Sequence, residues 1–138
     1  MRYGEAPLSE ITLRKYESPT GKQGKEELLR KILMSLGLLQ PGDGREGIVQ
    51  VFLKVLELKE STTEEIFEKL DKKMAISGIR RHLARLEEIN LVMRKEKKYR
   101  LVESNLSASV DYAAKKMDTD VKAVFERIEE YAKKFDGL

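Results

Sequence analysis

The 138-residue sequence has no cysteine, no tryptophan, a single histidine (His82) and few aromatic residues. Without cysteine the chain cannot form a disulfide, a thiolate nucleophile or a thiolate metal site. One histidine cannot build a zinc site alone, so we expect no metal and no cofactor. The aromatic side chains are too few and too scattered to form a stacking platform for single-stranded nucleic acid.

Two further absences concern membranes and catalysis. No run of about 18 apolar residues is present, and the first residues lack the apolar segment of a signal peptide, so we expect a cytoplasmic protein without a membrane partner. No nucleophile–base pair is recognisable, and we predict that the protein is not an enzyme. The scarcity of asparagine and cysteine beside abundant lysine and glutamate is typical of a thermophilic source.

Charge is abundant and unevenly distributed. Charged residues make up 37% of the chain, against about 25% in an average soluble domain. The formal net charge of the whole chain is only +3, but residues 69–100 hold eleven Lys/Arg and four Asp/Glu, a net charge of +7. A basic region of this kind indicates a polyanionic partner such as nucleic acid. A solvated lysine-rich face is the alternative interpretation.

Apolar periodicity divides the chain into helices and loops. Apolar side chains recur at helical spacing over residues 25–36, 47–59 and 77–89, and we predict an amphipathic helix over each range. Gly37 and Asn90 are placed to end the first and third of these helices, because both residue types tolerate the left-handed conformation.

A further helix is expected from about residue 62 to residue 73. Thr62 and Glu65 have the spacing of a capping box, and Ser61 with Glu64 offers a second register for the helix start.

The region after residue 90 predicts two short strands and more helix. Residues 91–93 and 99–101 are expected to pair as a hairpin around RKEKK, although this loop lacks the glycine that a tight primed turn prefers. Residues 106–117 carry one helical stripe, and Asp118 or Thr119 is placed to cap a separate last helix. The predicted fold class is therefore mainly α with a small β-hairpin.

These elements suggest four segments. Residues 1–24 form an N-terminal arm with a short strand near Ile11 and Leu13. Residues 25–46 form a helix and loop, residues 47–103 form the central domain, and residues 104–138 form C-terminal helices.

The order of elements in residues 47–103 is that of a winged helix-turn-helix domain. The sequence AISGIRRHLARLEEINLV resembles the middle helix of archaeal and bacterial winged-helix regulators of the ArsR and MarR type. Their pattern S-x-S-x-V-x-R-H-L-x-x-L-x-x-x-G-L-V is matched in register by Ser77, Ile79, Arg81, His82, Leu83, Leu86, Leu91 and Val92. The resemblance implies a winged-helix regulator whose recognition helix enters the major groove of DNA.

The residues themselves support double-stranded DNA as the partner. Rotation by the helical period leaves the arginines of residues 77–89 on other sides than the core positions, and arginine can form bidentate bonds to guanine. We expect the recognition helix to read bases and the basic wing, residues 94–100, to clamp flanking phosphates. The candidate DNA-binding residues are Ser77, Arg80, Arg81, His82, Arg85, Arg94, Lys95, Lys97, Lys98 and Arg100.

Each candidate also has an alternative role. Arg81 and Arg85 could instead pair with Glu64, Glu87 or Glu88 as surface salt bridges. His82 more often packs or caps in such a helix than reads bases.

Residues 25–36 and 106–135 supply more apolar surface than a small winged-helix core can cover, which favours a homodimer. The expected dimer contacts are Val121, Val124, Phe125, Ile128 and Phe135. Such a dimer would place two recognition helices about one turn of DNA apart. The alternative function is a winged-helix protein–protein interaction module in a transcription, replication or chromosome-organising complex, with a transcription-machinery protein as partner.

Overall fold

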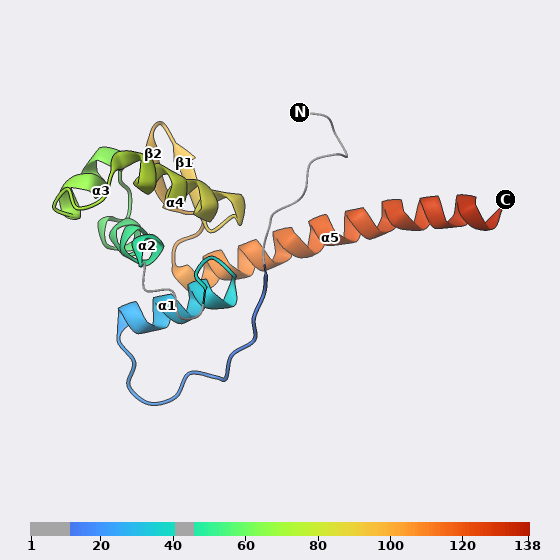
Figure 1. Cartoon of the computed structure of the whole chain (residues 1–138), viewed down its shortest axis with the longest axis horizontal. Helices are drawn as coiled ribbons and strands as arrows, with labels where there is room; N and C mark the ends of the chain where they lie inside the picture. The colour runs from blue at the N-terminus through green and yellow to red at the C-terminus, as the bar shows by residue number, and fades with distance from the viewer. Residues whose placement is uncertain (1–11, 41–45) are drawn as a thin grey trace.

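The computed structural model describes residues 12–40 and 46–138. These residues form mainly helices with one two-stranded antiparallel sheet, which confirms the predicted class (Figure 1). The helices are α1 (Lys25–Ser35), α2 (Gly47–Leu58), α3 (Thr63–Lys69), α4 (Ile76–Glu88) and α5 (Leu106–Asp136), and the strands are β1 (Val92–Lys95) and β2 (Lys98–Leu101). Among the described helices, none has both the length and the apolar character needed to cross a membrane.

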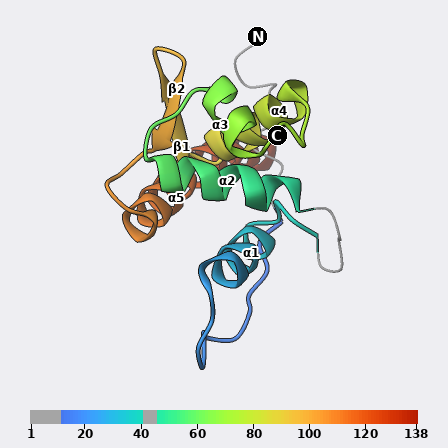
Figure 2. The same ribbon diagram turned by 90° about the vertical axis from the view of Figure 1, so that its left-hand side faces the viewer.

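Helix α2 lies at the centre of the core. Its side chains Val51, Phe52 and Val55 are buried, and they share one apolar cluster with Leu33 of α1 and Leu83 of α4. In both views α1 lies on one side of α2, whereas α3, α4 and the hairpin lie on the other (Figures 1 and 2). The apolar face of α1 is therefore used inside the core of its own chain.

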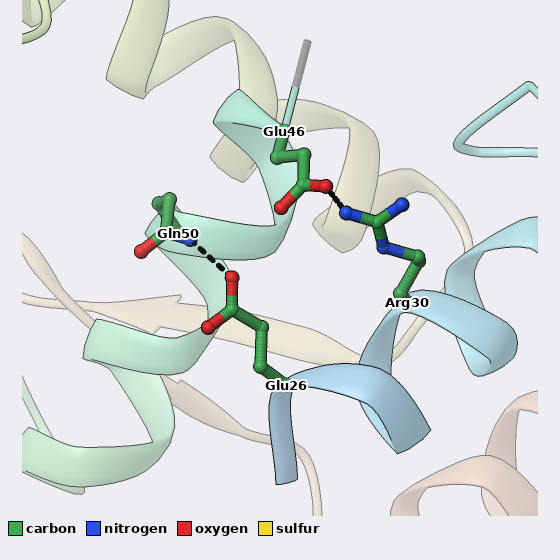
Figure 3. A network of polar contacts seen from close by, with 4 residues as sticks. All are labelled: Glu26, Arg30, Glu46 and Gln50. Carbon is green, nitrogen blue, oxygen red and sulfur yellow. Dashed lines mark hydrogen bonds and ion pairs between the residues drawn. The ribbon is translucent and has the colours of Figure 1, made fainter. Parts of the chain in front are cut away.

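Polar contacts also hold α1 against the first turn of α2 (Figure 3). The amide of Gln50 donates a hydrogen bond to a carboxylate oxygen of Glu26 at 2.8 Å. One turn further along α1, Arg30 forms an ion pair with Glu46, which immediately precedes α2. These two contacts lie beside the buried Leu29 and Leu33, which pack α1 into the core.

The ends of α1 and α4 confirm the expected stops. Gly37 and Asn90 have φ angles of 74° and 64°, in the left-handed region that follows a helix. At Gly37 a side chain is also excluded by space, because a Cβ atom there would lie 2.5 Å from the carbonyl oxygen of Thr12.

Helix α3 ends earlier than expected, at Lys69 instead of near residue 73. The next residues form a Schellman turn, in which the N–H of Lys72 donates to Phe67 O and the N–H of Asp71 donates to Glu68 O, both at 3.0 Å. Asp71 supplies the left-handed residue with a φ angle of 54°. The sequence has no glycine here, so the turn gave no obvious signal.

The start of α3 confirms the capping box of Thr62 and Glu65. The N–H of Glu65 donates to Thr62 Oγ1 and the N–H of Thr62 donates to Glu65 Oε1, each at 3.1 Å. Ser61 does not cap the helix. Its backbone pairs with Tyr99 of β2 through hydrogen bonds of 2.7 and 3.0 Å, which adds a short third segment beside the hairpin.

The hairpin is tighter than expected. Residues Glu96 and Lys97 form its two-residue turn with φ angles of 52° and 70°, so the two strands extend to Lys95 and Lys98. Both central residues have positive φ, as a type I′ turn requires. The hairpin therefore forms this turn without glycine.

The expected break near residue 118 is absent, and α5 is one helix of 31 residues. Thr119 does not cap a new helix, because its hydroxyl donates to the carbonyl oxygen of Lys115 one turn earlier at 3.0 Å. This bond to the preceding turn places Thr119 inside the helix, whereas an N-cap side chain would accept from a backbone N–H. The two stripes predicted for separate helices thus lie along one rod.

The prediction of a short N-terminal strand near residue 13 is also wrong for the residues that the structure describes. Residues 12–20 form no strand, and Leu13 is exposed, while Ile11 lies outside the described residues. The N–H of Arg14 donates to Ser35 O at the end of α1, at 2.9 Å. The segment therefore hydrogen-bonds to the end of a helix, which cannot pair with it as a strand would.

Candidate nucleic-acid interface

Helix α4 separates its apolar and cationic side chains by its helical period. Ile79, Leu83 and Leu86 are completely buried against the other helices. Ser77, Arg80 and Arg81 are exposed, and Arg85 is half-buried. Because the three leucine and isoleucine side chains fix the rotation of α4, the positions of its arginines follow from packing.

Ion pairing distinguishes the three arginines of α4. Arg80 pairs with Glu64 of α3 through a nitrogen–oxygen distance of 3.6 Å, with both side chains exposed. Such an exposed pair contributes little and can be exchanged for another anion. Within residues 12–40 and 46–138, no carboxylate lies within ion-pair distance of Arg81 or Arg85. The sequence offered Glu64 as a partner of Arg81 or Arg85, but in the structure Glu64 pairs with Arg80.

His82 lies beside Arg81 and Arg85 and lines the same pocket, together with Gly47. A Cβ atom on Gly47 would come within 2.7 Å of its Nε2, so its ring packs closely on the first residue of α2. Its Nδ1 is buried and has no hydrogen-bond partner among the described residues. Burial, followed by the positive charges of Arg81 and Arg85, lowers the pKa of His82. This geometry fits a neutral packing residue, and only glycine at position 47 leaves room for it.

The N-terminus of α4 leaves backbone donors available. Ala75 at the N-cap forms no hydrogen bond through its side chain, whereas Thr62 caps α3 and Asn105 caps α5. The first N–H groups of a helix have no partner within the helix. In α4 these groups lie beside the exposed Ser77, where they could donate to a phosphate.

The five cations of the hairpin lie on its two faces and in its turn. Cross-strand partners lie on the same face, and Arg94 pairs with the buried Tyr99. By the alternation of strand side chains, Lys95, Lys98 and Arg100 lie together on the opposite face. Lys97 occupies the turn. The predicted wing residues are therefore not one cluster, because three share a face, one lies behind them and one is at the tip.

All five hairpin cations are exposed. Lys98 pairs with Glu60 at 3.3 Å, and both side chains are about half exposed. For the other four, no carboxylate of the described residues lies within ion-pair distance. The hairpin and α4 lie on the same side of α2, away from α1, so the structure brings the two cationic elements to one side of the core (Figure 2).

The predicted dimer residues lie on the part of α5 that extends away from the core (Figure 1). They are all exposed, with exposed fractions from 40% at Val124 to 76% at Phe135. Tyr131 is 71% exposed on the same helix and was missed by the sequence reasoning. Its spacing of three residues after Ile128 and four before Phe135 is the signal that could have found it.

No protein-family model, curated protein or solved structure matches this chain. Within the described residues, no group of three or more His, Asp or Glu side chains is arranged to hold a metal ion.

Proposed function

We propose that the protein is a sequence-specific, double-stranded-DNA-binding regulator with a winged helix-turn-helix domain, acting as a homodimer. The observation that carries the proposal is the exposed Arg81 and the half-buried Arg85 on α4, with no acidic partner among the described residues, on the same side of the core as a basic hairpin. Helix α3, the turn after it, α4 and the hairpin follow one another in the order of a winged helix.

In this proposal α4 enters the major groove, which admits a helix of its width. Arg81 and Ser77 lie on the side of α4 opposite to the buried side chains and would reach base edges. Arg80 would give up its weak pair with Glu64 for a phosphate or a base. His82 takes no part in reading bases, because its ring packs on Gly47.

The hairpin would contact flanking phosphates through Lys95, Lys98 and Arg100 on one face and Lys97 at the tip. Each phosphate contact releases about one counterion, so the logarithm of affinity should fall by roughly 0.9 per contact for each unit of log salt. Cations on a protruding hairpin suit this role, because backbone contacts position a protein without reading sequence.

A mobility-shift assay tests the proposal after bound sequences have been selected from genomic fragments at two salt concentrations. Arg81→Ala should cost about 1–3 kcal/mol on the selected sequence and much less on random DNA, because it removes a base contact. Lys97→Ala should weaken binding to both DNAs alike and reduce the salt slope by about one.

Lys115→Ala is the matched control. This exposed lysine pairs with Asp111 on α5, away from the proposed interface, so its loss should leave affinity unchanged. Binding that ignores both sequence and salt would refute the proposal, and equal losses on both DNAs for Arg81→Ala would refute its assigned role. A stoichiometric protein partner without any DNA shift would support the interaction module instead.

A further inference from the structure

Helix α5 is buried at its start and, apart from the half-buried Met117 and Asp120, exposed after Ala113. Ser109 and Ala113, in its first two turns, are 0% and 6% exposed, and no later residue of the helix is buried. We call residues 25–40 and 46–113 the body and residues 114–138 the distal α5. A single helix of this length with a large exposed apolar face has not buried the surface that its sequence provides.

Six apolar residues of the distal α5 follow a regular repeat. Their spacing alternates between four and three residues, which is the heptad pattern of a coiled coil. We call this set the seam; it consists of Met117, Val121, Val124, Ile128, Tyr131 and Phe135. Because a period of 3.5 residues is slightly shorter than the 3.6 residues of a helical turn, the seam winds slowly around the helix and fits another helix of the same period when the two supercoil.

We propose that a second copy of this chain covers the seam, with the two distal α5 helices antiparallel. The sizes of the seam residues favour this direction. The antiparallel register that pairs the whole seam places Met117 against Phe135 of the second copy, Val121 against Tyr131 and Val124 against Ile128. Each smaller side chain then meets a larger one, which keeps the layers uniform in volume.

A parallel pair would stack identical residues. Two Phe135 and two Tyr131 side chains would crowd one end, while two Val121 side chains would leave space at the other. Cores pack closely and tolerate such mismatches poorly. The side-chain sizes of the seam therefore favour the antiparallel pair over the parallel pair.

Phe125, beside the seam, supports the same direction. It is 64% exposed and directly follows Val124. In the antiparallel register Phe125 lies next to the two-fold axis and packs against Phe125 of the second copy, which buries both rings. In a parallel pair the position facing Phe125 is Asp120, a carboxylate that would lose water without gaining a partner.

The charges beside the seam agree with the antiparallel register as well. Asp120 would face Lys134 of the second copy, and symmetry forms this pair twice. Asp120 now lies 3.5 Å from Lys116 in its own helix, an exposed pair that can be shared. Arg127 would meet its own counterpart at the axis, but it is already paired with Glu130 at 2.7 Å. A parallel pair would form no oppositely charged contact at these positions.

This pairing gives the proposed regulator its shape. In the same register Ala114 meets Leu138 of the second copy, so the end of each helix reaches the point where the other leaves its body. The two bodies lie at opposite ends of a shared rod, and the rod length sets the spacing of the two α4 helices. The inference rests on the homodimer of the proposed function but not on DNA binding.

Cysteine cross-linking tests the direction, because the chain has no cysteine of its own. Val121→Cys and Tyr131→Cys are made separately, and each variant is oxidised alone and after mixing, without DNA. The antiparallel pair predicts a cross-linked dimer only in the mixture. Lys122→Cys, outside the seam, is the control that should not cross-link under any condition.

Sedimentation of the unmodified protein accompanies this experiment. We expect a dimer, and Val124→Asp should convert it to a monomer whose circular dichroism still shows a folded body. Cross-linking of each cysteine variant with itself would overturn the antiparallel direction. A monomeric unmodified protein at tens of micromolar would overturn the pairing altogether. Neither result depends on DNA, so the two proposals can fail separately. DNA binding by a monomer would contradict only the pairing, and a cross-linked dimer that binds no DNA would contradict only the DNA-binding function.

Discussion

In the body, α1 and α4 bury their apolar stripes against α2, whereas the apolar stripe of the distal α5 has no buried residue and lies outside the core cluster of the described residues. Leu33 and Leu83 are fully buried, while Phe125 and Phe135 are mostly exposed. The difference does not lie in the residue types, since both regions are amphipathic helices. It lies in the position of α5, which leaves the core after two turns.

The comparison separates two uses of the same periodicity. A stripe that finds partners in its own chain contributes to folding, and its energy does not depend on protein concentration. A stripe left exposed contributes only when another molecule covers it, so its energy follows mass action. The two regions should therefore respond differently to the same substitution.

Substitution of phenylalanine in each region has the largest expected effect. Phe52→Ala removes a fully buried ring from α2 and should lower the free energy of unfolding by about 3–5 kcal/mol. Phe125→Ala should leave the unfolding of the body almost unchanged at low protein concentration but should shift the monomer–dimer equilibrium towards monomer. Urea unfolding at two protein concentrations measures both effects. A concentration-independent loss for Phe125→Ala would show that the ring is buried within its own chain.

The junction between the two regions gives an intermediate effect. The N–H of Ala108 donates to Asn105 Oδ1 at 2.8 Å, and this cap fixes the first turn of α5 on the body. Asn105→Ala should cost about 1 kcal/mol and fray that turn. Thr62→Ala, which removes the cap of α3, should cost a similar amount without affecting α5. Hydrogen exchange at the start of α5 would distinguish them, and equal protection in both variants would contradict the role of Asn105.

The smallest effect concerns acid stability and is confined to the body. The folded state lowers the pKa of His82 below its ordinary value of 6.5, so the unfolded chain binds a proton first as the pH falls. The free energy of unfolding should therefore decrease below about pH 6.5, down to the lowered pKa. His82→Gln should have a smaller decrease than the unmodified protein between pH 7.5 and 5.5, measured by urea unfolding. Identical pH dependence in both proteins would contradict this prediction.

Much of the body could be predicted because its signals are local. Helical periodicity located α1, α2 and α4 to within one or two residues, and the capping box of Thr62 and Glu65 located the start of α3. Asn90 ended α4 as expected. Where prediction failed, the turns place residues with a weak preference for the left-handed conformation at positive φ angles, such as Asp71 after α3 and Glu96 with Lys97 in the hairpin. The energy of packing on both sides of such a turn can hold non-glycine residues in left-handed conformations.

The candidate interface was predictable as a set of cations but not as an arrangement. The sequence indicated that α4 and the hairpin are basic, yet it could not show that Arg80 pairs with Glu64 or that His82 packs on Gly47. It also could not assign Arg94 to the face opposite Lys95, Lys98 and Arg100, because that assignment requires the strand register.

The sequence by itself determined the helix periods, the capping box of α3, the basic region and the apolar repeat of the last helix, because each of these depends on residues close together in the chain. Tertiary structure alone decided which apolar stripe is buried and which is exposed. It directed α5 away from the core after the first two turns of that helix, so the body leaves the distal stripe uncovered. Burial depends on contacts between distant segments, and no local pattern specifies them.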